Sequence, residues 1–365
     1  MRLPSIYPVG RPPRMTPVIG RLTTNRLHFI IQSNLITSSW SRRIVKGLAG
    51  LAMLGAVGVG ALLSALWLER RTEITLAAAT GPFAVGRANY VWADEAQVDT
   101  LAPVPGATRK LLAWIWYPSA AGPSRAIDDY VPAQMRAAAG PPSGPMSLVT
   151  RDPAKVHIHS ARDSEVAPQS FPVVIMRAGA SAGVVGYSTL AEDLASHGYI
   201  VAGFDAPYRT SVVVFPDGRV MRRTPENNPE LCAEKAHTLQ DGCMSRLLAA
   251  WTRDIALALD RLEWLNTTDP PGKFTGRLDL TRVGVFGHSF GGATAAQFCH
   301  DDARCKAGID IDGQPFGSVV QEGWRQSSRP HLLRHVPQGR QRLRADDVIA
   351  ALPGGPDSPV KGDDR

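Results

Sequence analysis

The sequence predicts an α/β protein in which helices cover both faces of a mostly parallel sheet, preceded by one membrane-spanning helix. Two observations carry this prediction. Between residues 171 and 312, short apolar runs alternate with segments of helical spacing, which is typical of a parallel sheet built from successive strand–helix units. Residues 47–68 form a run of 22 residues without a charge, enough to cross a hydrocarbon core of roughly 30 Å as a helix.

The first half of the chain supplies four predicted strands. The aromatic and β-branched stretches GRANYVWADE and RKLLAWIWYPSA predict two early strands. The Pro/Gly/Ala-rich residues 119–170 predict a surface excursion with one short helix near residues 133–139. FPVVIM (171–176) and YIVAGFD (199–205) predict strands buried on both faces, with the helix YSTLAEDLASHG between them.

The second half continues the alternation after an interruption. Residues 206–243 are polar and predict an insertion over one end of the sheet. A long amphipathic helix follows, because apolar residues recur on one face from Leu248 to Leu265. RVGVF (282–286) and AGIDID (307–312) predict two further strands with a helix between them, and no internal repeat is visible.

Residues 44–68 are the predicted transmembrane helix, after a basic Pro- and Arg-rich tract at 1–43. Three basic residues within positions 42–46 precede the apolar run. The positive-inside rule therefore places the N-terminus in the cytoplasm and the catalytic domain on the outer side of a single-pass cell-membrane protein. A cleaved signal peptide is an alternative, because LAAAT at 76–80 offers small residues. A buried core helix is another.

The positive charge of the chain is concentrated at its two ends. The formal net charge is +7, but residues 1–46 carry +8, residues 47–322 carry −4 and residues 323–365 carry +3. The body of the protein is therefore mildly acidic, and the sequence does not support binding to nucleic acid.

The four cysteines fall into two close pairs, Cys232 with Cys243 and Cys299 with Cys305. An even count and local pairing predict two disulfides, which suit an exported domain. Buried thiols are one alternative. A metal site at Cys232, His237 and Cys243 is another, but it lacks a fourth ligand. We expect no metal and no other cofactor.

The segment RVGVFGHSFGGATAAQF (282–298) changes abruptly from strand-forming to helix-forming residues. At the carboxyl end of a parallel strand, a Gly-x-Ser-x-Gly turn makes Ser289 expose its hydroxyl, while Gly287 and Gly291 avoid collisions with neighbouring backbone. The helix that follows directs its unpaired N–H groups at developing negative charge, which makes the Phe290 N–H a candidate oxyanion donor. A glycine-rich turn without chemistry is the alternative.

A serine nucleophile needs a base, and the base needs an acid to orient it. Asp312 follows Ser289 by 23 residues, at the end of the next predicted strand, where its carboxylate can reach the same edge. Asp310 competes but lies deeper within the strand, and Asp312 could instead cap a turn. The second oxyanion donor is expected at the backbone N–H of Ala180 or its neighbour. We expect His288 to pack elsewhere rather than serve as the base.

Five stretches of the chain resemble bacterial relatives of the secreted, plasma-type platelet-activating-factor acetylhydrolases, within the α/β-hydrolase superfamily: TGPFAVGRANYVW, WIWYPS, DLASHGYIVAGFDAPYR, VGVFGHSFGGATAAQ and AGIDIDG. The resemblance spans roughly residues 80–322 and implies an α/β-hydrolase domain over that range. It implies a nucleophile at Ser289, an acid at Asp312, and oxyanion donors at Phe290 and about Ala180. One departure is the oxyanion loop, where the family often has His-Gly and this chain reads Arg-Ala-Gly-Ala; a backbone donor survives that change.

The expected order of the triad is Ser, Asp, His, but only His331 and His335 follow Asp312. Both lie in RPHLLRHV, which could form a broken strand. After about Gln326 the chain is rich in Arg, Pro, Gly and Asp. We therefore expect residues 323–365 to be an atypical, disordered tail that lacks the last strand and helix of the fold, as a frame-shifted or truncated C-terminus would. In the alternative, a natural tail, one of the two histidines is the base, and we assign His331.

The predicted function is hydrolysis of short acyl esters, of a phospholipid or a small lipid, through an acyl-enzyme at Ser289. Anchoring beside a bilayer suits such a substrate. The main alternative is a catalytically impaired pseudohydrolase, or a truncated membrane-tethered binding module, that lacks the triad histidine. A peptidase or a dienelactone-type hydrolase on the same fold differs only in the shape of the pocket.

Overall fold

The computed structural model describes residues 39–120, 126–140, 144, 147, 150–180, 182–235, 242–322 and 332–336. The chain divides into two compact units, residues 1–62 and 63–365. Helix α1 (Ser39–Arg71) extends beyond the predicted transmembrane range at both ends and is long and apolar enough to cross a membrane. Its apolar side chains are exposed, which excludes a buried core helix. Most of the predicted basic tract at 1–43 lies outside the described residues.

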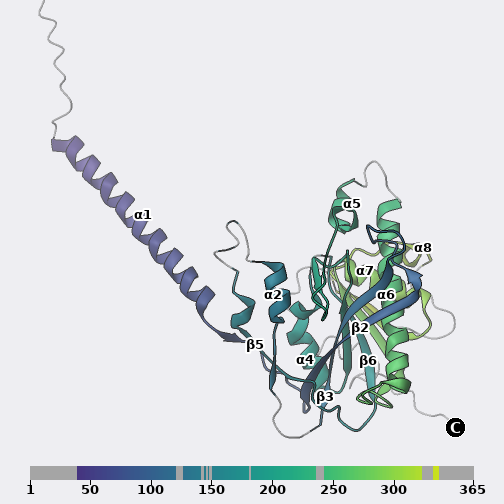
Figure 1. The fold of residues 1–365 in the computed structure, drawn as a ribbon. Coiled ribbons are helices and arrows are strands. Elements are labelled where there is room, and N and C mark those ends of the chain that lie inside the picture. The colour runs from purple at the N-terminus through teal and green to yellow at the C-terminus, as the bar shows by residue number, and fades with distance from the viewer. Residues whose placement is uncertain are drawn as a thin grey trace, which may run out of the picture. The chain divides into compact units, whose positions relative to one another are not determined.

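Within the described residues, ten strands form one sheet in the order β1-β5-β2-β3-β7-β6-β10-β11-β12, with β4 paired to β5 (Figure 1). The five neighbouring strands β7, β6, β10, β11 and β12 are parallel, and β3 is antiparallel to both β2 and β7. A separate hairpin joins β8 and β9. The bounds are β1 (Ile74–Thr75), β2 (Ala84–Val98), β3 (Thr108–Ser119), β4 (Ile127–Asp129), β5 (Val156–Arg162), β6 (Phe171–Arg177), β7 (Ile200–Asp205), β8 (Val212–Val214), β9 (Val220–Arg222), β10 (Leu278–His288), β11 (Cys305–Ile311) and β12 (Leu332–Val336).

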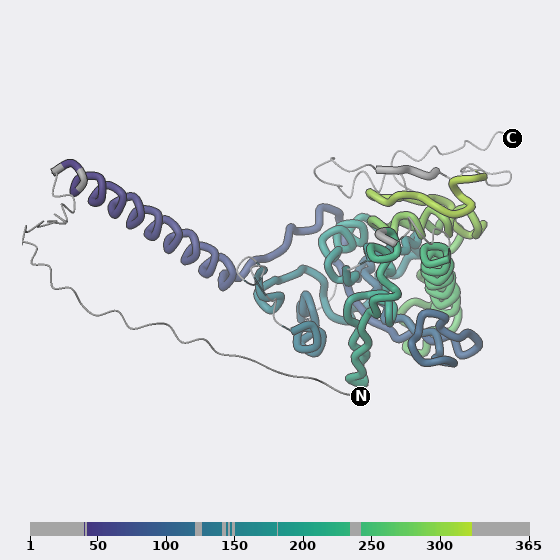
Figure 2. Tube along the Cα trace, turned by 90° about the horizontal axis from the view of Figure 1, so that it is seen from above, coloured from purple at the N-terminus to yellow at the C-terminus, as the bar shows by residue number. Residues whose placement is uncertain are grey.

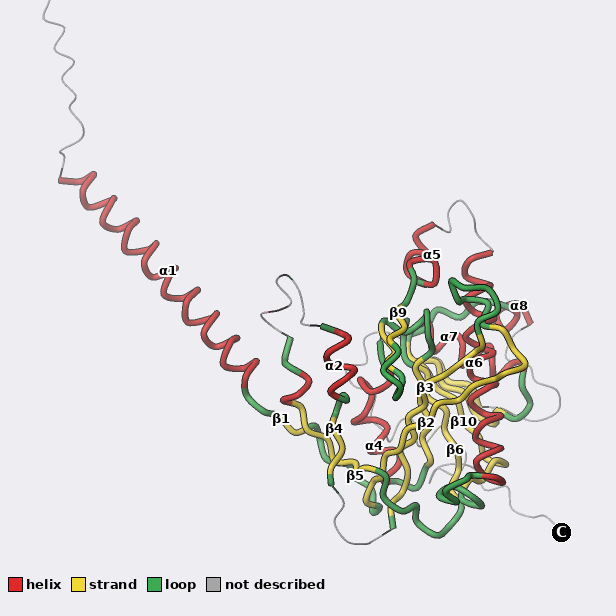
Figure 3. Tube along the Cα trace, viewed as in Figure 1, coloured by secondary structure: helices red, strands yellow, loops and turns green. Residues whose placement is uncertain are grey.

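Helices cover both faces of this mostly parallel sheet, as predicted. On one face, Ile175 of β6 packs with Ile255 of α6 in a core that α7 also joins. On the other face, Val174 of β6 packs with Leu194 of α4, because successive strand side chains point to opposite faces. Figure 3 shows α4 and α6 on opposite sides of the strands. The bounds are α2 (Ala133–Ala139), α4 (Ser188–Ser196), α5 (Pro229–Lys235), α6 (Gly242–Thr268), α7 (Phe290–Asp301) and α8 (Ser318–Glu322).

The predicted insertion lies between β7 and α6 and contains the β8–β9 hairpin and α5. Figure 2 looks down onto the end of the molecule that carries it. The Cys232–Cys243 disulfide ties α5 to the start of α6, and the Cys299–Cys305 disulfide ties α7 to β11. Both predicted pairs are confirmed. Because their sulfurs bind each other, Cys232 and Cys243 are not metal ligands in this structure, and His237 lies outside the described residues.

The tail differs from its prediction at one point. Residues Leu332–Val336, within the stretch offered as a broken strand, form β12, which pairs in parallel with β11 and extends a sheet that we expected to lack its last strand. The edge of β11 would otherwise present unpaired backbone groups, and a short apolar segment is enough to pair with them. The rest of residues 323–365 lies outside the described part of the chain.

Candidate active site

The candidate nucleophile lies on a strained turn between β10 and α7. Ser289 has a φ of 54° and a ψ of −127°, a conformation that a residue with a Cβ rarely adopts and that suits a serine on a sharp strand-to-helix turn. A Cβ at Gly287 would collide with the Gly291 carbonyl, and one at Gly291 with the Ala178 carbonyl. These contacts give the physical reason for both glycines, and Ser289 itself remains partly exposed.

The candidate acid follows the neighbouring strand at the same edge. His288 and Ile311 are paired in the sheet, so the next residues, Ser289 and Asp312, leave the sheet side by side. The Ser289 N–H donates to the Ile311 carbonyl at 2.8 Å. Asp312 also has a positive φ, 56°, and is partly exposed. Two adjacent strands therefore end in strained residues, one carrying a hydroxyl and the other a carboxylate.

The competing carboxylate, Asp310, has a different environment. Its side chain is fully buried, and its Oδ1 accepts a hydrogen bond from the Gly313 N–H at 2.9 Å. A Cβ at Gly292 would collide with the same oxygen, so the start of α7 lies directly against it. Asp310 therefore fixes the residues that follow β11, Asp312 and Gly313, which we call the acid loop, beneath the serine turn.

The loop after β6 supplies the second candidate oxyanion donor. A Cβ at Gly179 would lie 3.5 Å from the Ser289 Cβ, so this loop adjoins the serine. Within the described residues, the N–H groups of Ala180 and Phe290 make no hydrogen bond. For Phe290 this is expected, since N–H groups in the first turn of a helix have no intrahelical partner. Arg223 donates from Nη1 to the Ala180 carbonyl at 2.9 Å and so restrains that peptide. Two free donors beside a hydroxyl can stabilise an oxyanion.

A tyrosine that the sequence analysis did not identify joins this loop to the nucleophile turn. The Tyr187 hydroxyl accepts a hydrogen bond from the Gly179 N–H at 3.3 Å and lies 2.9 Å from Nδ1 of His288. Burial raises the pKa of Tyr187, which keeps the phenol protonated at neutral pH. His288 thus packs on Tyr187. Nothing in the local sequence links two residues that are 101 positions apart.

A buried arginine ends β6, immediately before the oxyanion loop. Arg177 is 1% exposed, its guanidinium carbon lies 3.8 Å from the centroid of the Trp251 ring, and its Nη1 donates to the Phe204 carbonyl at 3.4 Å. Its Nε and Nη2 have no hydrogen-bond partner within the described residues. Burial lowers the pKa of Arg177 to about 10. The side chain is still cationic at neutral pH and adds positive potential next to the oxyanion donors.

A buried carboxylate fixes the far end of the same loop. Oδ1 of Asp205, at the end of β7, accepts a hydrogen bond from the Val184 N–H at 2.9 Å. Burial raises the pKa of Asp205 to about 6, although the Val184 N–H and the Arg177 charge lower it. The oxyanion loop is therefore held between an arginine and a carboxylate that are both removed from water.

An ion network of four buried side chains attaches the start of the insertion to α6. Arg209 donates from Nη1 to Asp99 at 2.8 Å and from Nη2 to Asp254 at 3.0 Å, and Arg109 donates to Asp254 at 2.5 Å. Burial by itself lowers the pKa of Arg209, but Asp254 and Asp99 raise it further, so the net shift is upward. Removing one partner would leave an uncompensated buried charge, which is costly.

An apolar cluster lies beside the serine. The Phe290 ring packs edge-on against Trp251, with ring centroids 4.8 Å apart, and stacks on Phe316 at 5.5 Å. Ala180 and Cys232 belong to the same cluster. The insertion therefore supplies one wall of the site, and the residues after the acid loop supply another.

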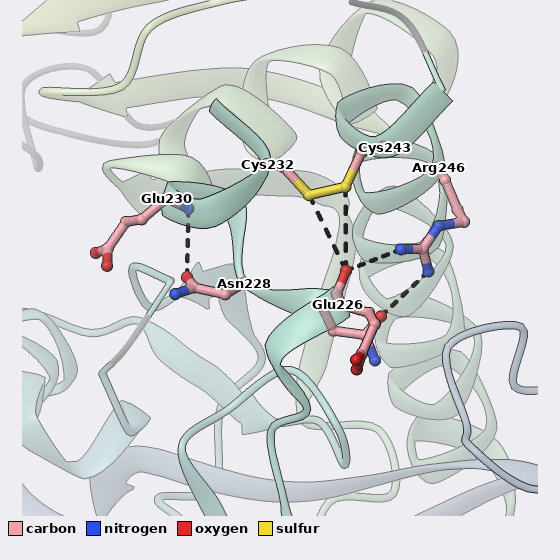
Figure 4. The surroundings of a disulfide bond; sticks show 7 residues. Glu226, Asn228, Glu230, Cys232, Cys243 and Arg246 are labelled. Carbon is pink, nitrogen blue, oxygen red and sulfur yellow. Dashed lines mark hydrogen bonds between the residues drawn. A yellow bond between two sulfur atoms is a disulfide. The ribbon is translucent and has the colours of Figure 1, made fainter. Parts of the chain in front are cut away.

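The disulfide and its hydrogen bonds hold this wall in place (Figure 4). Arg246 of α6 donates from Nη2 to the Glu226 carbonyl at 2.9 Å and from Nη1 to Asn227 Oδ1 at 3.1 Å. Asn227 in turn donates to a carbonyl of the β2–β3 loop at 2.7 Å. The residues just before α5 are thus fixed to α6 on one side and to the β2–β3 connection on the other.

The two candidate bases are placed only in part. His335 lies in β12, where its backbone is paired with Asp310, and its side chain is not described. His331 lies outside the described residues, next to Leu332, which pairs with Ala307. Among the described side chains, no group of three or more His, Cys, Asp or Glu is arranged to hold a metal ion.

Comparisons with known proteins show which families and folds this chain is similar to. Residues 221–337 match the family described as platelet-activating factor acetylhydrolase, isoform II. The chain is 27% identical over 177 residues to a probable 1-alkyl-2-acetylglycerophosphocholine esterase of Arthroderma benhamiae, covering 47% of this chain and 39% of that protein. It is 28% identical over 160 residues to the platelet-activating factor acetylhydrolase of Cavia porcellus, covering 40% of this chain and 36% of that protein. The matched region thus spans less than two fifths of either relative.

A solved structure extends the likeness over most of the chain. The ferulic acid esterase from Streptomyces cinnamoneus superposes with a TM-score of 0.54 and 27% sequence identity, covering 72% of this chain and 75% of the other. A fold shared at this identity supports an esterase architecture, while substrate depends on the walls of the site.

Proposed function

Because this chain is a relative of the isoform II platelet-activating factor acetylhydrolases, with an esterase-like α/β fold, we propose that it is a serine ester hydrolase acting on short acyl esters. The observation that carries the proposal is the strained Ser289 between two glycines that cannot bear a Cβ. The backbone N–H groups of Ala180 and Phe290 adjoin it, and neither has a hydrogen-bond partner among the described residues.

The proposed reaction proceeds through an acyl-enzyme. The Ser289 hydroxyl attacks the ester carbonyl carbon and passes its proton to the base, while the Ala180 and Phe290 N–H groups bind the oxyanion. The ester C–O bond breaks, and the alcohol leaves with that proton. Water then attacks the acyl-enzyme, again through the base, and releases the acid. Asp312 orients the base, for which His331 is the candidate.

The proposed substrate class follows from the apolar side chains beside Ser289 and from the position of α1 in a membrane. An apolar cluster around Phe290 suits a short acyl group or an apolar leaving group. A retained α1 would anchor the domain beside a bilayer, with the N-terminus in the cytoplasm and the two disulfides on the outer side. A phospholipid or small lipid ester is therefore the proposed substrate.

One observation favours a second candidate, a catalytically impaired hydrolase that keeps the pocket. The histidine next to Ser289, His288, shares a hydrogen bond with Tyr187, and His335, one of the two histidines that follow Asp312, lies within β12 with its backbone paired in the sheet. Loss of the base would lower turnover by about 10⁴- to 10⁶-fold.

Hydrolysis of p-nitrophenyl acetate by the full chain separates the two candidates. We expect turnover that Ser289→Ala reduces to the buffer rate and that His331→Gln reduces by about 10⁴-fold. His335→Gln serves as the matched control and should retain activity. Turnover unchanged in Ser289→Ala would reject the hydrolase, and turnover absent from the unmodified chain would favour the impaired protein. Equal activity in both histidine variants would place the base elsewhere.

A further inference from the structure

Two hollows lie away from the serine, at the end of α1, and each has a volume of about 470 Å³. The first is bounded by α2, residues 150–153 and residues 210–212, and it reaches Gly183 at the end of the oxyanion loop. The second lies between the last turn of α1 and the short helix Pro153–Lys155. Arg70 and Asp152 line both hollows, so the two form one continuous surface.

The surface carries an excess of positive charge. Its five cationic side chains belong to Arg70, Arg71, Arg136, Arg151 and Lys155. Three carboxylates are nearby, and each already has a partner: Glu69 pairs with Arg151, Glu73 pairs with Lys155, and Asp152 accepts the Ala154 N–H.

Arg70 is one of three arginines on this surface, with Arg71 and Arg136, that have no carboxylate partner within the described residues, and it alone of the three lines both hollows. It is half-buried, and within the described residues it has neither a hydrogen bond nor an ion pair. Its neighbour Arg71 stacks on Trp67 instead, 4.0 Å from the ring centroid. A partly desolvated guanidinium without a carboxylate is a strong donor for a phosphate, which it can bind through two parallel hydrogen bonds.

The chain places this surface at the level of a membrane headgroup. The uncharged run of α1 ends at Leu68, two residues before Arg70. Trp67 is 53% exposed, and tryptophan at the end of an apolar span is typical of the membrane–water interface. The first hollow is also mainly apolar, because Val131, Met135 and Val212 line it beside the arginines.

We propose that this surface binds an anionic phospholipid of the bilayer. The phosphate lies at Arg70, the cation common to both hollows, and part of an acyl chain lies along Met135 and Val212 on the α2 side. The apolar lining disfavours a free phosphate, and the cationic excess disfavours a lipid without net charge. The inference goes beyond the proposed ester hydrolysis and does not depend on Ser289.

Binding to the full chain in a neutral detergent tests the proposal, with lipid occupancy counted by native mass spectrometry. The probes are diether phosphatidylglycerol, which has no ester to hydrolyse, diether phosphatidylcholine and inorganic phosphate. We expect saturable binding of phosphatidylglycerol, binding of phosphatidylcholine at least tenfold weaker, and no competition from phosphate at equal concentration. Equal affinity for the two lipids, or equal competition by phosphate, would overturn the proposal.

Variants locate the site. Arg70→Gln should weaken phosphatidylglycerol binding about tenfold or more, because a charge-assisted contact is lost. Ala139→Trp fills the first hollow without changing charge and should weaken it too. Arg219→Gln is the control. It removes an exposed arginine that pairs with Asp217 and does not line either hollow, so it should leave binding unchanged. If Arg70→Gln and Ala139→Trp both bind phosphatidylglycerol as tightly as the unmodified chain, the lipid does not bind at this surface. Ser289→Ala should bind normally, so a failed hydrolase assay and a failed lipid assay are distinguishable.

Discussion

The two sides of Ser289 are built in different ways. On the β6 side, the loop after β6 is restrained by the side chains of Tyr187, eight residues after Gly179, and of Asp205 and Arg223, which lie further along the chain. On the β11 side, the acid loop is restrained by the two strands that meet there, through the Ser289 N–H and the buried Asp310.

This difference corresponds to two requirements of the proposed ester hydrolysis. Oxyanion donors act by being fixed before the reaction, so many weak restraints on one short loop are useful. The acid only has to reach a base that a later part of the chain supplies. The restraints on the β6 side therefore lie among the described residues, whereas the β11 side depends on a base, for which the candidate is His331, next to the start of β12.

The largest expected effect distinguishes the two carboxylates of the β11 side. Asp312→Asn should lower kcat for p-nitrophenyl acetate by about 10⁴-fold, because an amide cannot hold the base in its productive tautomer. Asp310→Asn is the matched control: its amide oxygen can still accept from the Gly313 N–H, so turnover should stay within about tenfold. A larger loss in Asp310→Asn than in Asp312→Asn would reverse the assignment of the acid.

The next effect concerns stability on the β6 side. The folded protein holds the pKa of Asp205 at about 6, above its ordinary value of 3.8, because burial disfavours the charged form. The native state thus binds the proton more tightly than the unfolded state, and this contribution to stability is lost as pH rises from about 4 to about 6. The loss amounts to about 3 kcal/mol at full effect.

Denaturant unfolding of Asp205→Asn between pH 4 and pH 7 measures this contribution. The free energy of unfolding of Asp205→Asn should not decline over this pH range. That of Glu95→Gln, which changes an exposed carboxylate, should decline as in the unmodified protein. A decline of equal size in both variants would mean that another group titrates. The comparison also tests whether the oxyanion loop depends on Asp205, since Val184 is hydrogen-bonded to it.

The parts of the fold that sequence predicted best are governed by local contacts. The strands 171–177 and 200–205 are nearly all apolar, and the two disulfides close loops of only 11 and 6 residues. The serine turn was predictable because its Gly-x-Ser-x-Gly pattern is local, although only Gly287 is excluded from bearing a side chain by its own motif, whereas Gly291 is excluded by the Ala178 carbonyl of the loop after β6.

The parts that sequence missed depend on distant partners. Arg209 and Asp99 are 110 residues apart. Each is a charged residue, of a type usually found on the solvated surface, so the sequence around it does not predict a buried ion pair. Strand β12, which the sequence offered only as a broken strand within an atypical tail, has five residues, and its partner is the edge of β11. Tyr187 was missed for the same reason, because its importance lies in a hydrogen bond to a strand end that folding brings near.

The smallest expected effect tests whether those distant restraints matter for catalysis. Tyr187→Phe removes the hydroxyl that joins Gly179 to His288 and should lower kcat about tenfold with little change in KM, since an oxyanion contact acts in the transition state. Tyr199→Phe is the matched control, because the buried Tyr199 hydroxyl has no hydrogen-bond partner among the described residues. If both variants keep full kcat, the oxyanion loop is held sufficiently by Arg223 and Asp205. If Tyr187→Phe instead raises KM alone, the tyrosine contacts substrate rather than positioning the donors.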